Sequence, residues 1–373
     1  MTSRKGIMLF TILVFALSAL VLIPVLSACS PSGDGTTTTV TVTTTKTVTG
    51  GDDEPYSVEN PFILKHNSHW VPGSSGEYWE PILFNQYVEY VTGGEVIVEM
   101  YPGGALGSLS DNWDMTKTGV TDMAFIWTPI HVAELPLCTL FSIPGLADNQ
   151  SVMNSVQIEL YDKYPEFEAQ YAPRKWIGNI AAMRSDLHSV DEPILSLDDL
   201  KGKVFACSTE SMAQVMRDLG GEGTVIVGAD AYSAAQTGAV DGIACPWGYF
   251  DEWKMDEVTT YHTNVGLSPG LCSWIMNMDS FNKLKPAHQA AIEKFQYEGI
   301  YNLIRSNIIQ VNNSYDRIPA ENIFNFSDAD TAELKGMLTP YWDDWADDMD
   351  ALGLPGTEIL ADAIMYIDRY HFF

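Results

Sequence analysis

The alternation of apolar and polar positions in the first third of the folded chain predicts short strands separated by helices. Residues 62–66 are expected to form a strand, and apolar positions at helical spacing predict a helix over 77–92. Residues 95–100 alternate as a strand does, a helix is expected over 111–117, and 122–126 form a short apolar strand. This order of strands and helices is typical of an α/β unit.

The same order returns later in the chain. Strands are expected over 203–206, 224–227 and 242–245, with helices over 211–219 and 233–237 between them. The chain therefore contains two α/β units in sequence.

A further strand over 273–277 and a long helical pattern over 286–312 follow the second unit. A helix of that length can lie across both units. The predicted fold class is therefore α/β with two lobes, a ligand cleft between them and a long connecting helix, similar to periplasmic binding proteins.

The N-terminus has the features of an export signal. Arg4 and Lys5 precede an uncharged, mostly apolar stretch over residues 7–28, which is also long enough to span a bilayer. Leu26, Ser27 and Ala28 lead directly into Cys29, which resembles the bacterial lipobox in which the cysteine thiol is lipidated. We expect a cleaved signal and a lipid anchor on Cys29, with an uncleaved membrane helix as the alternative.

A threonine-rich segment follows the cysteine. Ten of the fourteen residues over 36–49 are threonine, so the segment has too little apolar surface to fold and is expected to be a tether. The expected organisation is a signal at 1–28, a disordered tether at 29–60, a first lobe at 61–185, a second lobe at 186–270, and a return strand, long helix and C-terminal helices at 271–373.

The charge balance excludes one class of partner. The chain has 49 acidic and 20 basic residues, a formal net charge of −29, which argues against nucleic-acid binding. Such acidity favours solubility, and a cationic ligand is the sharper alternative.

Four cysteines besides Cys29 are widely scattered, without a C-x-x-C pair, so no metal site and no cofactor is expected. Because an exported chain can meet an oxidising environment, one or two disulfides among these cysteines are possible. The motifs H-E-x-x-H, G-x-S-x-G and the P-loop are also missing from the sequence, so the chain is expected to bind a ligand rather than to be an enzyme.

Four segments in the right order carry a resemblance to a known family. They are the strand and glycine-rich loop at 96–107, the turn at 118–124, the stretch at 197–203 and the turn and strand at 232–246. The chain resembles the substrate-binding proteins of TRAP (tripartite ATP-independent periplasmic) transporters.

Together with the lipobox at Cys29, the resemblance implies an extracytoplasmic lipoprotein on the outer face of the cytoplasmic membrane. Such a protein captures a small organic molecule, an organic acid that can be aromatic, by hinge closure and delivers it to the TRAP membrane subunits. A binding protein of another import or sensing system is the alternative, and a secreted hydrolase is a weaker one.

The sequence departs from the family where most members hold a carboxylate with arginine. That position is Ala206 here, and two further polar positions of the family are Ala244 and Cys245. Arg184 resembles a second arginine of the family, with spacing that differs by about two residues. The resemblance therefore implies either a less polar ligand or an acid held by Arg184 alone.

Aromatic residues near the expected cleft suit an aromatic ligand, although any one of them can equally belong to the core. His66 and His69 follow the first strand and are expected to be satisfied surface histidines, with contact to the ligand as the alternative. The candidate ligand-binding residues are Trp70, Trp127, Arg184, Phe205, Cys207, Ser208, Cys245, Trp247 and Asn277.

Overall fold

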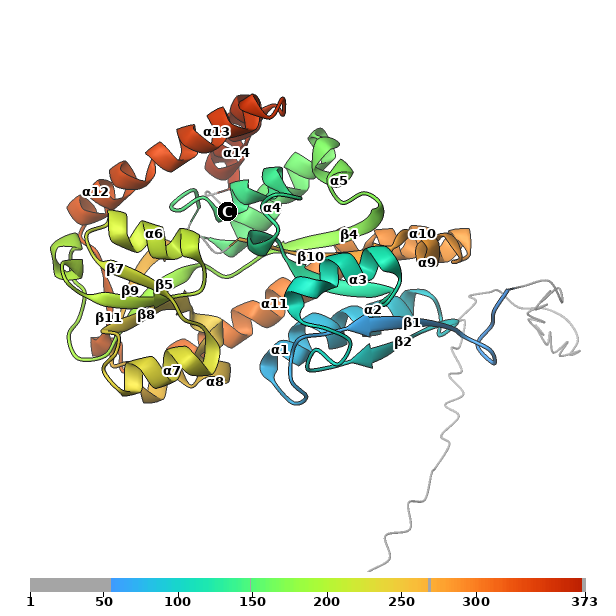
Figure 1. Cartoon of the computed structure of the whole chain (residues 1–373), viewed down its shortest axis with the longest axis horizontal. Helices are drawn as coiled ribbons and strands as arrows, with labels where there is room; N and C mark the ends of the chain where they lie inside the picture. Colours follow the sequence, from blue (N-terminus) through green and yellow to red (C-terminus); the bar gives the residue numbers. More distant parts are fainter. Residues whose placement is uncertain (1–54, 148, 268–269, 371–373) are drawn as a thin grey trace, which may run out of the picture. The chain divides into compact units, whose positions relative to one another are not determined.

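The computed structural model describes residues 55–147, 149–267 and 270–370 (Figure 1). The expected signal, the lipidation site at Cys29 and nearly all of the expected tether lie outside the described residues. Within the described part, no helix is both long and apolar enough to cross a membrane.

The first sheet has five strands in the order β2-β1-β3-β10-β4. β1 pairs in parallel with both β2 and β3, whereas β10 runs antiparallel to β3 and to β4. The helical residues 75–91 include a π-helical turn, η1, which contains Pro81 and lies between α1 and α2. The elements are β1 (Phe62–Asn67), α1 (Ser75–Glu77), η1 (Tyr78–Ile82), α2 (Leu83–Val91), β2 (Val96–Tyr101), η2 (Leu109–Asp111), α3 (Asn112–Thr118), β3 (Met123–Trp127), β4 (Arg174–Ala181) and β10 (Leu271–Asn277).

The second sheet has six strands in the order β11-β9-β5-β8-β6-β7. Its parallel pairs are β6 with β7, β6 with β8 and β11 with β9, while β5 is antiparallel to both of its neighbours. The elements are β5 (Ser185–Ser189), η5 (Leu197–Leu200), β6 (Val204–Cys207), α6 (Glu210–Asp218), β7 (Glu222–Val225), α7 (Gly228–Gln236), β8 (Gly242–Pro246), η6 (Trp247–Tyr249), α8 (Phe250–Trp253), η7 (Met255–Glu257), β9 (Tyr261–Leu267) and β11 (Ile323–Asn325).

The chain passes between the two sheets more than once. β4 of the first sheet leads into β5 of the second, and β9 of the second leads back into β10 of the first. The two-sheet α/β fold confirms the predicted fold class, although β4, β5 and β9 were not anticipated as strands.

The long helical pattern over 286–312 is two helices, α10 (Pro286–Glu293) and α11 (Phe295–Tyr315), separated at Lys294. The first residue of α11 packs in the core of the first sheet, where the Phe295 ring lies 4.6 Å from the Phe84 ring and 5.2 Å from the Trp274 ring. At the other end of α11, the Tyr315 ring stacks 4.0 Å from Trp247, which follows the second sheet's β8. A single helix is therefore packed against both sheets.

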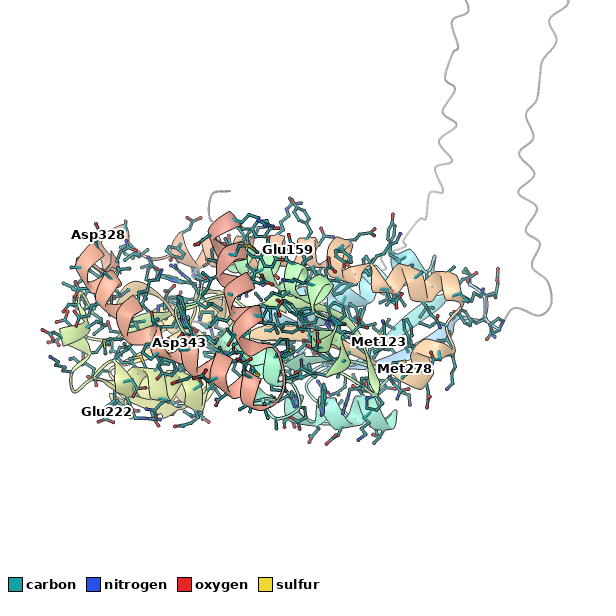
Figure 2. The ribbon with its side chains drawn as sticks, turned by 90° about the horizontal axis from the view of Figure 1, so that it is seen from above. Met123, Glu159, Glu222, Met278, Asp328 and Asp343 are labelled. Carbon is teal, nitrogen blue, oxygen red and sulfur yellow. The ribbon has the colours of Figure 1, made fainter. Side chains whose placement is uncertain are left out.

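The C-terminal helices also connect the two parts. On α13, the indole of Trp345 donates to Thr139 Oγ1 beside the first sheet at 2.8 Å, and the Tyr341 hydroxyl donates to Asp218 of α6. Figure 2 marks these helices by Asp328 on α12 and Asp343 on α13. The remaining elements are η3 (Thr128–Ile130), η4 (Pro136–Ser142), α4 (Gln150–Lys163), α5 (Glu166–Ala169), α9 (Met278–Asn282), η8 (Ala320–Asn322), α12 (Asp328–Leu338), α13 (Pro340–Ala351) and α14 (Gly356–Tyr370).

Candidate functional site

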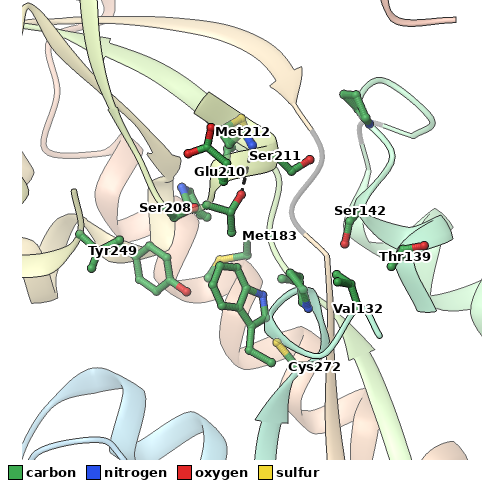
Figure 3. Close-up of a pocket in the computed structure, with 18 of the residues that line it drawn as sticks. Val132, Thr139, Ser142, Met183, Ser208, Glu210, Ser211, Met212, Tyr249 and Cys272 are labelled. Carbon is green, nitrogen blue, oxygen red and sulfur yellow. Dashed lines mark hydrogen bonds between the residues drawn. The ribbon is translucent and has the colours of Figure 1, made fainter. Parts of the chain in front are cut away.

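A cavity of about 830 Å³ is bounded by residues that belong to, or follow, strands of both sheets and by residues of α13. Figure 3 shows part of its lining. A volume of this size suits a small organic molecule. The lining is mostly apolar and aromatic, and its aromatic members are Trp70, Phe125, Trp127, Tyr249, Trp253, Tyr341 and Trp345.

The wall on the first sheet comes from the carboxyl ends of parallel strands. Trp127 ends β3 and Trp70 follows β1, and such strand ends meet at one edge of a sheet. Gly76 leaves room for the Trp70 ring, because a Cβ at that position would lie 2.3 Å from it. Both tryptophans, predicted as ligand-binding residues, are thereby brought to the same cavity.

The wall on the second sheet is the loop between β6 and α6. Thr209 caps α6 by accepting a hydrogen bond from the backbone N–H of Met212 at 3.1 Å. Figure 3 shows Ser208 and Ser211 at the cavity, so this wall offers hydroxyl groups. Glu210 also lines the cavity, but its carboxylate accepts from Arg217 Nη2 at 2.5 Å.

The cavity has an unusual charge pattern for a site that is expected to take acids. Among the described lining residues there is no lysine and no arginine, and the carboxylates are Glu210, Asp344 and Asp348. Asp344 and Asp348 are exposed, where water screens their charge. His69 is therefore the one described lining side chain that can become positively charged by taking up a proton.

The expectation that His66 and His69 are surface residues is wrong. His69 lies in the cavity wall, with its ring 4.4 Å from the Trp70 ring and stacked 5.7 Å from Phe125. Burial, together with the neighbouring His66, lowers the pKa of His69 to about 4. The imidazole of His69 is therefore neutral at pH 7 in the free protein.

His66 is fully buried behind this wall. Its Nδ1 donates to Asn85 Oδ1 at 2.6 Å, which leaves Nε2 facing Glu80 Oε1 at 3.6 Å. Burial lowers the pKa of His66 to about 4 and raises that of Glu80 well above its ordinary value. These directions favour a neutral imidazole beside a protonated carboxyl group, so the pair adds no net charge behind the cavity.

Arg184 lies beside the cavity but is not part of its lining. Its Nε donates to Asp186 Oδ2 at 3.1 Å, and Asp186 is fully buried. The other oxygen of Asp186 accepts from the backbone N–H groups of Val265 and Gly266, at 2.8 Å and 3.0 Å. The arginine charge therefore compensates a buried carboxylate where β5 and β9 meet, whereas its neighbours Met183 and Ser185 do line the cavity.

Five further candidate residues lie away from the cavity lining. Phe205 and Cys207 are buried in the core against α6, and Trp247 packs between Phe250 and Tyr315. Cys245 lies in the buried strand β8, where its carbonyl accepts from His188 Nε2. Asn277 caps α9 by accepting from the backbone N–H of Ser280 at 2.9 Å, and it donates to the carbonyl of Thr116.

The cysteines in the described residues are free thiols, so the disulfides left open by the sequence are not formed. Cys138, Cys207, Cys245 and Cys272 are all buried, and burial raises the pKa of each thiol above its ordinary value. Cys272 lies in the cavity wall, where a protonated thiol contributes apolar surface. No cluster of metal-ligating side chains occurs among the described residues.

Sequence reasoning missed much of the lining. Phe125 and Tyr249 adjoin residues that were predicted, and the carboxyl ends of β3 and β8 were a usable signal for them. The contribution of α13 had no such signal, because Tyr341 and Trp345 are distant in sequence from both strands.

A comparison with protein families matches residues 68–348 to the bacterial extracellular solute-binding proteins of family 7. A curated relative, the uncharacterized protein YiiZ of Salmonella typhimurium, is 25% identical over 214 residues, which are 56% of this chain and 64% of the relative. The chain thus spans less than two thirds of the length of this relative.

Solved structures give the same fold. A TRAP periplasmic solute-binding protein from Desulfovibrio salexigens has a TM-score of 0.75 and 22% identity, over 83% of this chain and 96% of that one. A TRAP solute-binding protein from Rhodoferax ferrireducens, in complex with copurified benzoate, has a TM-score of 0.73 and 21% identity, over 82% and 98%.

Proposed function

Because this chain belongs to the bacterial extracellular solute-binding proteins of family 7, we propose that it captures a small organic acid with an aromatic body for a TRAP-type membrane transporter. The observation that carries the proposal is the cavity of about 830 Å³ with aromatic walls from both sheets. Aromatic side chains bind a flat ring through dispersion and edge-to-face contacts, and they exclude water from it.

Capture follows from the way the two sheets are joined. β4 leads into β5, β9 leads into β10, and α11 packs against both sheets. Segments of this kind act as hinges when a ligand contacts both walls, since closure adds contacts only in the occupied state. The closed, loaded form is then the species that the membrane subunits recognise.

The proposal includes attachment to the outer face of the cytoplasmic membrane through a lipid on Cys29. Its support is the sequence Leu26 to Cys29 directly after the apolar stretch. The variant Cys29→Ser is expected to lose labelled fatty acid and to leave the membrane fraction. A Cys29→Ser protein that keeps its label would contradict the anchor without affecting the capture function.

The capture function is tested by a thermal-shift screen of the purified protein against benzoate, 3-hydroxybenzoate, mandelate, succinate and the amides of the aromatic acids. A ligand that binds only the folded state adds about RT ln(1 + [L]/Kd) to the free energy of unfolding, so millimolar ligand with micromolar Kd raises the Tm clearly. We expect aromatic compounds to raise the Tm and succinate to leave it unchanged. A chain that no compound stabilises, or that only succinate stabilises, would contradict the proposal.

Trp127→Ala sharpens this test, because it removes one aromatic wall of the cavity. We expect the Kd for the stabilising compound to rise about tenfold, the equivalent of about 1.4 kcal/mol. Trp176→Ala is the matched control, since Trp176 stacks on Tyr161 and bonds Asn179 outside the cavity lining. An equal rise of the Kd in both variants would place the ligand elsewhere.

A further inference from the structure

An acid that enters this cavity meets no permanent positive charge among the described lining residues. The lining holds three carboxylates and one imidazole, and Arg184 compensates the buried Asp186 instead. Burying a carboxylate without a countercharge is costly. The proposed capture of acids, on which this inference rests, therefore requires a source of positive charge that appears together with the ligand.

We propose that His69 supplies this charge, so that the binding of one acid molecule is coupled to the uptake of one proton by its imidazole. The proton comes from the solvent and the ligand enters as its carboxylate. The product is an imidazolium that faces a carboxylate inside the cavity. No bond other than the N–H bond of the imidazole is formed, and the total charge of the buried pair is zero.

The geometry of His69 suits this role. Neither ring nitrogen has a hydrogen-bond partner in the described part of the chain. Nδ1 is buried, whereas Nε2 keeps some exposed surface. The ring plane is restrained by contacts with the rings of Trp70 and Phe125. A fixed ring with an unused nitrogen at the cavity can hold a ligand oxygen in one direction.

The surroundings of His69 keep it neutral until a ligand arrives. The titratable groups next to it outside the lining are His66 of β1 and Glu80 of η1. The other titratable groups in the described lining are Cys272 of β10, Tyr249 of η6, Glu210 of α6, and Tyr341, Asp344 and Asp348 of α13. None of these groups raises the pKa of His69: burial is the main cause that lowers it, and the neighbouring His66, which would repel a second positive charge, acts in the same direction. Without a nearby carboxylate, burial prevails and the ring stays unprotonated.

A bound carboxylate reverses this balance. An opposite charge within about 4–6 Å favours the charged form of a titratable group, and the closed cavity removes the water that would screen it. The proton is therefore taken up between the pKa of the free protein, about 4, and the higher pKa of the complex. In that window the Kd for an acid rises about tenfold for each unit of pH, because one proton binds with each ligand.

The test is isothermal titration calorimetry of the purified protein with benzoate and with benzamide, each in phosphate and in bis-Tris at pH 5.5, 6.5 and 7.5. The two buffers release protons with different enthalpies, so the difference in observed heat counts the protons taken up. We expect close to one proton per benzoate, close to none per benzamide, and a Kd that rises with pH for benzoate alone.

The variant His69→Gln identifies the group that takes up the proton. We expect it to lose the proton uptake and to bind benzoate at least tenfold more weakly at pH 5.5, with its Kd for benzamide changed less than threefold. His288→Gln is the matched control, because His288 bonds Tyr56 and Glu95 outside the cavity lining, and it should behave as the unchanged protein.

Three outcomes would overturn the inference. Uptake that persists in His69→Gln would mean that the proton travels on the ligand as benzoic acid. Benzoate binding without uptake would mean that no proton is needed. Binding of benzamide but not of benzoate at pH 5.5 would mean that the cavity rejects acids. The protein would then still capture an aromatic ligand, but that ligand would not be an acid.

Discussion

Two pairs of histidines occupy opposite halves of the molecule and differ in what surrounds them. In the second sheet, His188 and His262 face each other with their Nδ1 atoms 3.0 Å apart, and His188 Nε2 donates to the carbonyl of Cys245. In the first sheet, His66 is sealed by Asn85 and Glu80, whereas His69 borders the cavity.

The hydrogen bonds fix the tautomers of the closed pair. Since His188 Nε2 donates to a carbonyl, its Nδ1 accepts the proton of His262 Nδ1. Burial lowers the pKa of His188 well below its ordinary value and that of His262 to about 4. A neutral, enclosed pair of this kind has a structural role, whereas His69 has the same low pKa but access to a ligand.

The largest expected effect comes from a substitution in the core around the enclosed pair His188 and His262. Trp247 is 2% exposed and stacks between Phe250 and Tyr315 beside His188. Trp247→Ala should lower the free energy of unfolding by about 3–5 kcal/mol, because the cavity it leaves cannot be filled. Urea unfolding measures this, and a loss below 1 kcal/mol would mean that this part of the core is not well packed.

The next effect shows whether the charge of Arg184 stabilises the fold or binds the ligand. Arg184→Gln should lower the free energy of unfolding by about 2 kcal/mol, since it leaves the buried Asp186 without its cation while the arginine side chain itself is 30% exposed. The rise in Tm caused by benzoate should remain. A variant of unchanged stability that no longer responds to benzoate would instead make Arg184 a ligand-binding residue, as the family resemblance suggested.

A smaller effect concerns how the free energy of unfolding depends on pH. A histidine whose pKa is lower in the folded protein than in the unfolded chain destabilises the fold as pH falls from about 6.5, the ordinary value, towards about 4. His262→Gln should therefore reduce the slope of unfolding free energy against pH by up to about 1.4 kcal/mol per pH unit in this window. Urea unfolding at pH 7.5, 6 and 5 measures the difference, and parallel curves for the two proteins would contradict it.

Much of the fold could be predicted because its strands and helices follow simple apolar patterns. β5 could not, since Ser185, Asp186, His188 and Ser189 are polar and nevertheless buried. Their polar groups find partners in neighbouring strands, for example the backbone N–H groups that bond Asp186. A strand stabilised by such long-range partners has no apolar pattern in its own sequence.

The cavity was predicted in part for a related reason. Trp70, Trp127 and Ser208 follow strands whose ends converge, so local patterns were sufficient to find them. His69 looked like an exposed loop residue because nothing local indicates the Phe125 ring that packs on it from β3. Trp247 follows a strand in the same way as Trp127, yet the packing of α11 against it makes it a core residue.

The difference between the two histidine pairs can be measured directly by NMR of the imidazole nitrogens at pH 6.5, with and without benzoate, with signals assigned from His69→Gln and His262→Gln. We predict that benzoate converts the His69 signals from the neutral to the protonated form and leaves those of His188 and His262 neutral. Benzoate binding with His69 still neutral, or with a change at His188 and His262 instead, would contradict the account.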